Sequence, residues 1–229
     1  MALNESTRRP TAIIFDWDNT LVDSWMVIGD ALNTTLTAFG QAAWTPRQVR
    51  TRVRKSLRES FPVLFGDQWE QAADLFYTRY GEIHADMVQP ISGISAMLEE
   101  LSGMGIYLAV VSNKRGDYLR KEAEKLGWQK YFGGIVGAND AAHDKPAVDP
   151  VHLAMAAGPT CWTESKGERD VTAIWFVGDA DIDMECAINA GCTPVLMRRN
   201  DPEQGEFAEF PPVWRFQSGQ ALCKRLRSL

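Results

Sequence analysis

The stretch that decides the fold is AIIFDWDNT, residues 12–20, in which four apolar residues lead directly into two carboxylates separated by one residue. A short apolar run that ends in polar residues is typical of a strand buried on both faces of a parallel sheet. We therefore predict a strand over Ala12–Phe15, with Asp16 and Asp18 just beyond its carboxyl end.

The same kind of run recurs along the chain and alternates with helical patterns. Further strands are expected at Ile106–Val111, Val171–Val177 and Thr193–Met197, with weaker candidates at Gly134–Val136 and from Trp214. Amphipathic helices are expected at Ile94–Met104, Arg115–Leu126, Pro150–Ala157, Met184–Ala190 and Gln217–Leu226, and a polar surface loop at Gly158–Asp170. This alternation predicts an α/β fold with a Rossmann-like, doubly wound parallel sheet.

One region interrupts the alternation between strand and helix. From Val22 to Gln89 the pattern is helical only, with helices expected over Trp25–Phe39, from Thr45-Pro46 onward and over Gln68–Ala85. We therefore predict that residues 1–21 and 90–229 form the α/β catalytic core and that residues 22–89 form an inserted all-helical cap. The two connections between them, at about Leu21–Asp23 and Gln89–Ile91, are expected to act as hinges.

Polar clusters follow the predicted strands at the edge of the sheet where ligands bind in open α/β folds. The clusters after strands are Asp16–Thr20, Ser112–Lys114 and Gly178–Asp183, and a fourth, Lys145-Pro146, precedes the helix predicted at Pro150 and is expected at the same edge. Carboxylates gathered at one place require a cation, and a set of oxygen ligands suits Mg²⁺. A metal, a lysine and a carboxylate nucleophile together indicate phosphoryl transfer.

These clusters, DWDNT, SNK, KP and GDADID, resemble in order the four motifs of the haloacid-dehalogenase-like (HAD) phosphatases, and the helical insert resembles the cap of that family. The resemblance spans roughly Ala12 to Met197 and is nearest to the phosphoglycolate-phosphatase-like branch. It implies a phosphoric monoester hydrolase that uses Mg²⁺ and acts on a small phosphorylated metabolite.

The resemblance also implies the reacting groups. Asp16 would be the nucleophile that forms an aspartyl-phosphate. Asp18 would protonate the leaving oxygen and then activate water, because the two steps need opposite protonation states. The Asp16 carboxylate, the main-chain carbonyl of Asp18 and the Asp179 carboxylate would hold the Mg²⁺.

The remaining motif residues would support these groups. Ser112, Asn113 and Lys145 would bind the phosphoryl oxygens, and Lys145 would also neutralise Asp16. Asn113 is equally well explained as a turn former. Thr20 would brace the catalytic loop. Asp183 would orient a water molecule bound to the metal, or would serve only as a favourable charge at a helix N-terminus.

Two positions depart from the usual pattern of the family. Asn19 replaces the usual Gly and is expected to tolerate a left-handed backbone. Trp17 is bulkier than the usual Leu or Met, and we expect it to pack under the cap or to wall the site. Lys114 and Asp181 are interpreted as solvent-exposed charges, and His84, His143 and His152 as surface or packing residues.

The predicted cap carries arginines at three- or four-residue spacing, namely Arg47, Arg50, Arg54 and Arg58. On one continuous helix these arginines would form a stripe. Arg50 and Arg54 are then the candidates for contacting a second anionic group of the substrate. Two alternatives remain: the stripe is a solvated helix face, or the helix breaks near Arg54–Ser56 and scatters it.

Composition limits the class of protein. The chain has 229 residues, a formal net charge of -6 and 45% hydrophobic residues, which is typical of a globular protein and argues against nucleic acid or an anionic membrane as the partner. The cysteines, Cys161, Cys186, Cys192 and Cys223, form no CxxC pair and are interpreted as reduced thiols. Residues 1–10 contain no secretory h-region. We therefore expect a cytoplasmic monomer or homodimer.

The leading interpretation is a Mg²⁺-dependent phosphatase that hydrolyses a small, phosphoglycolate-like phosphomonoester. A phosphomutase, which passes the phosphoryl group to a sugar phosphate, would use the same motifs. A catalytically idle interaction protein of the same fold is disfavoured, because each expected reacting group is present.

Overall fold

The computed structural model of the chain describes residues 9–156, 158 and 173–229. The loop predicted over Gly158–Asp170 lies outside the described residues except for its first residue. Cys161 and the first two residues of the strand predicted at Val171–Val177 also lie outside them.

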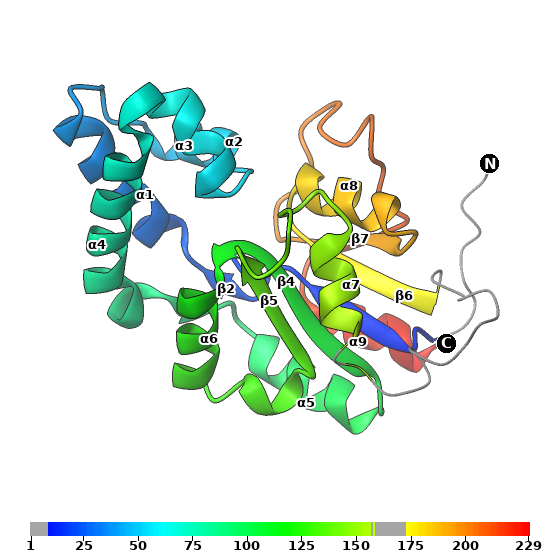
Figure 1. Cartoon of the computed structure of the whole chain (residues 1–229). Helices are drawn as coiled ribbons and strands as arrows, with labels where there is room; N and C mark the ends of the chain where they lie inside the picture. The colour runs from blue at the N-terminus through cyan, green and yellow to red at the C-terminus, as the bar shows by residue number, and fades with distance from the viewer. Residues whose placement is uncertain (1–8, 157, 159–172) are drawn as a thin grey trace.

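A six-stranded sheet occupies the centre of the molecule (Figure 1). Its strands are β1 (Ala12–Phe15), β4 (Tyr107–Arg115), β5 (Gly134–Ala138), β6 (Ile174–Gly178), β7 (Thr193–Met197) and β8 (Trp214–Phe216). Their order is β5-β4-β1-β6-β7-β8, and each neighbouring pair is parallel. Because β1 lies between β4 and β6, the carboxyl ends of these three strands meet at one edge of the sheet.

Helices cover both faces of this sheet. Ile13 and Phe15 pack into one hydrophobic cluster, and Ala12 and Ile14 pack into another, as expected for a strand whose side chains alternate between two buried faces. The first cluster contains residues of α5 (Ile94–Gly103), α6 (Gly116–Lys125) and α9 (Gly219–Arg227), and the second contains residues of α7 (Asp149–Ala156) and α8 (Asp181–Asn189). The predicted doubly wound α/β fold is confirmed.

The chain between β1 and α5 forms a separate helical layer beside one end of the sheet (Figure 1). It contains α1 (Trp25–Ala38), α2 (Pro46–Arg52), α3 (Leu57–Phe65) and α4 (Trp69–Met87), which we call the cap, and we call the rest of the described chain the core. One short 3-10 turn, Gly66–Gln68, lies in the cap and another, Gln129–Tyr131, in the core. The predicted start at Thr45-Pro46 is confirmed, since Thr45 and Gln48 form a reciprocal capping box.

The connections between cap and core pair with each other. Val22–Asp23 forms β2 and Gln89–Pro90 forms β3, and these two strands are antiparallel neighbours. The sequence did not predict them, because a two-residue strand carries no periodicity that could be recognised. We propose that this ribbon marks the boundary between the predicted domains, 1–21 with 90–229 and 22–89.

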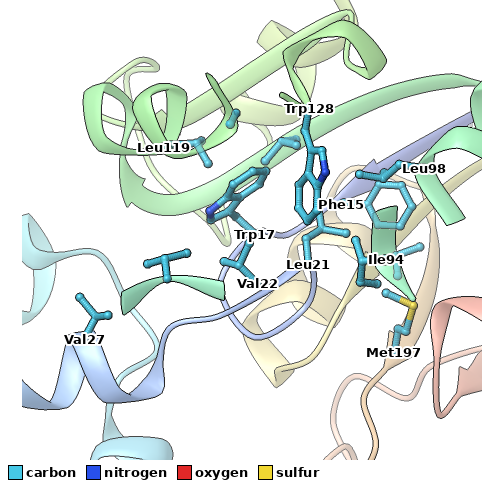
Figure 2. Close-up of a cluster of buried hydrophobic side chains, with 14 of the residues drawn as sticks. Phe15, Trp17, Leu21, Val22, Val27, Ile94, Leu98, Leu119, Trp128 and Met197 are labelled. Carbon is cyan, nitrogen blue, oxygen red and sulfur yellow. The ribbon is translucent and has the colours of Figure 1, made fainter. Parts of the chain in front are cut away.

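The hydrophobic core continues from the sheet to the base of the cap. Figure 2 shows Phe15 and Leu98 beneath the sheet, Trp17 and Trp128 beside them, and Val27 on α1. The Trp17 and Trp128 rings meet edge to face, with centroids 5.7 Å apart. Trp17 is fully buried and packs below the cap, and it is not among the described residues that line the cavity between cap and core, so it does not wall the site. None of the described helices combines the length and apolarity that crossing a bilayer requires.

Candidate active site

A cavity lies between the cap and the carboxyl ends of β1, β4 and β6. The core lines it with residues predicted for the site, namely Asp16, Asp18, Ser112, Asn113, Lys145, Asp179 and Asp183. The cap contributes Trp25, Ile28, Val53, Arg54, Lys55, Leu57, Phe76, Tyr77 and Tyr80. The four sequence motifs are therefore brought together at a single pocket, although they come from separate parts of the chain.

Asp16 lies at the end of β1 and is 6% exposed. The Lys145 ammonium donates to Asp16 Oδ1 at 2.6 Å, and the Thr20 hydroxyl donates to Asp16 Oδ2 at 3.3 Å. Burial raises the pKa of Asp16 to about 7, and the charges of Asp183 and Asp18 add to this effect against the opposing charge of Lys145. A carboxylate held in this way is oriented at both oxygens and poorly solvated, which suits a nucleophile.

Lys145 forms ion pairs with two carboxylates of the site, those of Asp16 and Asp183. Its ammonium is 2.7 Å from Asp183 Oδ1 as well as 2.6 Å from Asp16 Oδ1, and these two carboxylates raise the pKa of Lys145 although burial alone would lower it. Asn113 holds the lysine's main chain: its Oδ1 accepts from Lys145 N at 2.9 Å and its Nδ2 donates to Lys145 O at 3.1 Å. We therefore propose that Asn113 positions Lys145 in addition to, or in place of, the phosphate contact that the sequence predicts.

Asp179 and Asp183 lie at the start of α8. Asp183 Oδ2 accepts from the main-chain N–H groups of Asp179 and Ala180 at 3.1 and 3.0 Å. Gly178 makes this arrangement possible, because a Cβ at position 178 would lie 2.3 Å from the Asp183 carboxyl carbon. The carboxylate of Asp183 thus fixes the loop at the start of α8 and also pairs with Lys145.

Carboxylate oxygens of Asp16, Asp179 and Asp183 lie within 4.8 Å of one another. Burial, together with the charges of Asp183 and Asp16, raises the pKa of Asp179 well above its usual range. Of these three close carboxylates, Asp16 and Asp183 pair with Lys145, so the group needs further positive charge, and oxygen donors suit a hard divalent cation. The group therefore fits a divalent metal. The Asp18 carboxylate is not among the described residues of this group. This is compatible with the prediction that Asp18 would bind the metal through its main-chain carbonyl and not through its side chain.

Lys114 also lines the cavity, and its environment differs from the one predicted. Lys114 is not exposed: its side chain is 5% exposed, and its ammonium lies 2.6 Å from Asp18 Oδ1 and 2.6 Å from Glu122 Oε2. The two carboxylates raise the pKa of Lys114 against the effect of burial. Ser112 is buried, and its hydroxyl accepts from the main-chain N–H of Lys114. Asn19 has a φ of 64°, as expected for its left-handed position.

Glu122 and His84 form part of the same buried group. Glu122 lies outside the predicted motifs, and His84 is buried on α4 with its Nδ1 3.0 Å from Glu122 Oε1. His143 and His152 are exposed, in line with their interpretation as surface residues. No motif pointed to Glu122, since its partners come from separate parts of the chain and two of them, Tyr80 and His84, lie on the cap helix α4.

The arginine stripe is broken. Helix α2 ends at Arg52 and α3 begins at Leu57, so the predicted alternative of a break near Arg54–Ser56 holds. Arg50 is exposed on α2 and is not among the described residues that line the cavity. Arg54 does line it.

Two cap arginines contact the core beside the site. Arg54 Nε lies 3.0 Å from Asp181 Oδ1, so Asp181 is a half-exposed ion-pair partner at the start of α8 and not a free loop charge. Arg58 makes a bidentate contact with Asp144, at 2.5 and 2.6 Å. Asp144 is buried and directly precedes Lys145. Both contacts lie between the cap and the core beside the catalytic edge of the sheet.

Comparisons with known proteins agree with this geometry. The sequence profile of the haloacid dehalogenase-like hydrolases matches residues 13–197. A phosphoglycolate phosphatase of Aquifex aeolicus is 32% identical over 185 residues, 80% of this chain and 83% of that protein. A pyrophosphatase of Bacillus velezensis is 26% identical over 184 residues, 80% of this chain and 81% of that protein. A crystal structure described as a predicted phosphoglycolate phosphatase of Haemophilus somnus has the same fold, with a TM-score of 0.79 at 22% identity over 96% of this chain and 99% of that one. The predictions of an enzyme and of a phosphatase branch within this family are confirmed, and the chain belongs to the haloacid dehalogenase-like hydrolases, on their phosphoglycolate-phosphatase-like branch.

Proposed function

We propose that the protein is a Mg²⁺-dependent phosphatase that hydrolyses a small phosphomonoester through an aspartyl-phosphate on Asp16. The observation that carries this proposal is the position of Asp16, whose carboxylate is buried at the cavity, held by Lys145 at 2.6 Å and adjacent to a group of carboxylates that fits a cation.

In the first step, an Asp16 carboxylate oxygen attacks phosphorus, forming a new O–P bond while the bond from phosphorus to the leaving oxygen breaks. Asp18 donates its proton to that leaving oxygen, and the alcohol departs. Lys145 and the Ser112 hydroxyl bind the transferring phosphoryl oxygens. In the second step, water attacks phosphorus while the Asp18 carboxylate takes up a water proton. The bond between phosphorus and the Asp16 oxygen breaks, so inorganic phosphate leaves and the Asp16 carboxylate is restored.

Asp16, Asp179 and the main-chain carbonyl of Asp18 are the proposed metal ligands, and Asp183 lies close enough to contact a water or the ion itself. When bound, Mg²⁺ would neutralise part of the phosphate charge and align it with Asp16. Thr20 braces Asp16 from the side opposite Lys145, since the two residues bind different oxygens of its carboxylate.

The substrate is proposed to be a small phosphorylated metabolite, with phosphoglycolate as the first compound to test. Relatives named phosphoglycolate phosphatase support this choice. The cap wall contains apolar side chains, among them Ile28, Val53 and Leu57, with Arg54 beside them. Such a wall suits an organic leaving group that carries one further anionic group.

We expect the purified protein to release phosphate from p-nitrophenyl phosphate and from at least one member of a panel of small phosphate esters, and to lose this activity in EDTA. Phosphate release with Mg²⁺ restored is the measurement. Transfer of phosphate to an added hexose phosphate, in place of release to water, would favour the phosphomutase. A protein inactive on the whole panel with several divalent metals would contradict the proposed function.

Metal binding should stabilise the protein, and more so at higher pH. Burial raises the folded-state pKa of Asp16 from 3.8 to about 7. Without metal, the free energy of unfolding therefore falls as the pH rises from about 4 to about 7, because the folded protein must then lose a proton that it holds more tightly than the unfolded chain does. Mg²⁺ binds the charged carboxylates and should offset this loss. The rise in Tm on adding millimolar Mg²⁺ is therefore expected to be larger at about pH 8 than at about pH 5. An equal or smaller rise at the higher pH would contradict the assignment of the metal group.

Arg54 is expected to recognise the second anionic group of the substrate. Arg54→Gln should lower kcat/KM for phosphoglycolate by about tenfold or more, the usual cost of a lost hydrogen bond to a charged group, and should spare phenyl phosphate. Arg50→Gln is the matched comparison, since Arg50 is exposed away from the cavity. Equal losses on both substrates would indicate a defect of the cap and not of recognition.

We propose a cytoplasmic location. In the described part of the chain Cys186, Cys192 and Cys223 are free and buried, and such thiols are characteristic of a reducing compartment. Whether the protein is a monomer or a homodimer stays a prediction that sedimentation can test.

A further inference from the structure

A buried carboxylate that the proposed mechanism does not use lies at the junction of cap and core. Glu122, on α6, has a side chain only 2% exposed. Its Oε2 accepts from the Trp17 indole N–H at 2.8 Å and from the Lys114 ammonium at 2.6 Å. Its Oε1 accepts from the Tyr80 hydroxyl at 2.9 Å and lies 3.0 Å from His84 Nδ1. One carboxylate thus holds four side chains.

These four side chains come from three separate parts of the molecule. Trp17 lies between Asp16 and Asp18 in the catalytic loop, Lys114 lies at the end of β4, and Tyr80 and His84 lie on the cap helix α4. The cap residues can bind Glu122 only while α4 is packed against α6. The network therefore links the position of the cap to the catalytic loop.

Lys114 connects Glu122 to the reacting groups. Its ammonium is shared between Glu122 Oε2 and Asp18 Oδ1, each at 2.6 Å. A lysine with Asp18 as its single anionic partner would draw that carboxylate toward itself and away from the leaving oxygen. Glu122 supplies a second anionic partner for Lys114. The attraction between the Lys114 ammonium and the Asp18 carboxylate is thereby weakened, while Lys114 still orients Asp18.

We propose that Glu122 is a positioning residue for the proposed phosphatase reaction, which acts through Lys114 to place the Asp18 side chain, with Tyr80 and His84 making this placement depend on the closed cap. The inference rests on the proposed function, because it assumes that Asp18 protonates the leaving oxygen. It assigns Lys114, Trp17 and the cap helix α4 a role in catalysis that could not be inferred from the sequence motifs.

The test uses the dependence of kcat/KM on the leaving group, because kcat/KM reports the first chemical step and not hydrolysis of the aspartyl-phosphate. Phenyl phosphate needs the proton from Asp18, whereas 2,4-dinitrophenyl phosphate has a good leaving group on the same aromatic ring and hardly needs it. Glu122→Gln is nearly isosteric. The Tyr80 hydroxyl and the His84 ring can reverse their donor and acceptor roles to satisfy the new amide.

We expect Glu122→Gln to lower kcat/KM by about 10²-fold for phenyl phosphate, the usual contribution of a positioned general acid, and by less than about threefold for the dinitrophenyl ester. Glu100→Gln is the matched control, since Glu100 pairs with Arg227 at the surface. Equal losses on the two esters, or a loss no greater than that of the control, would overturn the inference.

Tyr80→Phe keeps the charge of Glu122 and decides the matter if Glu122→Gln does not fold. We expect a loss of about three- to tenfold on phenyl phosphate alone, as for one hydrogen bond, and no further loss when the change is added to Glu122→Gln. Tyr107→Phe, which removes a hydroxyl bound to Ala154 O, is the control. Additive losses, or no selective loss in Tyr80→Phe, would overturn the role of the cap. A wild-type protein inactive on both esters would instead overturn the proposed function, and the inference with it.

Discussion

Asp16→Asn is expected to abolish turnover while leaving the protein folded. Asparagine has nearly the same shape as aspartate, so the packing at the end of β1 is retained, but its amide is a poor nucleophile and a weaker metal ligand. Loss of a covalent nucleophile typically lowers kcat by about 10⁴-fold or more. The measurement is steady-state phosphate release with p-nitrophenyl phosphate at saturating Mg²⁺.

The stability of the same variant gives an independent check. Because burial raises the pKa of Asp16 to about 7, the charged carboxylate costs the metal-free fold stability at higher pH. Asparagine carries no such charge, so in EDTA at about pH 8 the Tm of Asp16→Asn should equal or exceed that of the wild type. Mg²⁺ should raise its Tm less than it raises that of the wild type.

Asp74→Asn is the matched control, since Asp74 is exposed on α4. Turnover by Asp16→Asn within a few-fold of wild type would refute the role of Asp16 as nucleophile. A collapsed melting transition would instead show that the carboxylate is needed for folding, and the catalytic comparison would then pass to Lys145.

The fold and the catalytic edge of the sheet could be predicted because both depend on local patterns. Apolar runs such as Ala12–Phe15 are buried on both faces whatever surrounds them, and parallel strands bring their carboxyl ends together. Asp16, Ser112 and Asp179 therefore meet at one cavity as a consequence of topology. The motif order added the resemblance to a family, which the comparisons then confirmed.

The contacts between cap and core could not be predicted in the same way. Lys114 is buried because it pairs with Glu122, eight residues away, which also binds Tyr80 on the cap helix α4. Nothing in the local sequence of Lys114 distinguishes a buried lysine from a solvated one. The one available signal was Trp17, an unusual residue for the motif, whose indole N–H needs a buried acceptor and finds it in Glu122.

The arginines of the cap illustrate a second limit, that of helix continuity. The spacing of Arg50 and Arg54 is compatible with one helix, but the chain turns between Arg52 and Leu57, and only Arg54 reaches the cavity. Val53 and Ser56 both have extended backbone conformations, so the helical path ends after Arg52 and restarts at Leu57. Arg54 reaches the cavity and Arg50 does not because the chain changes direction between α2 and α3, which their spacing in the sequence does not show.

Lys145→Met is expected to be the most damaging change outside the nucleophile, because it affects both catalysis and stability. Lys145 is 2% exposed and pairs with Asp16 and Asp183 at 2.6 and 2.7 Å. Methionine fills much of the same space but leaves these carboxylates without their shared cation. Removing one partner of a buried ion pair typically costs about 3–5 kcal/mol, and for a chain of this size this lowers Tm by about 10 °C.

The catalytic loss should be of the order of 10²–10³-fold in kcat, as for other donors that stabilise charge in the transition state. Lys224→Met, at an exposed position on α9, is the matched control and should leave both rate and Tm within error of the wild type. Mg²⁺ should partly restore the stability of Lys145→Met, because a divalent cation neutralises the same carboxylates as the lysine ammonium. Mg²⁺ cannot replace the contact between the lysine and the phosphoryl group, so kcat should remain low. Stability that recovers with Mg²⁺ while kcat remains low would support both roles of Lys145. Full recovery of kcat together with Tm would show that the lysine only balances charge in the fold and does not bind the transferring phosphoryl group.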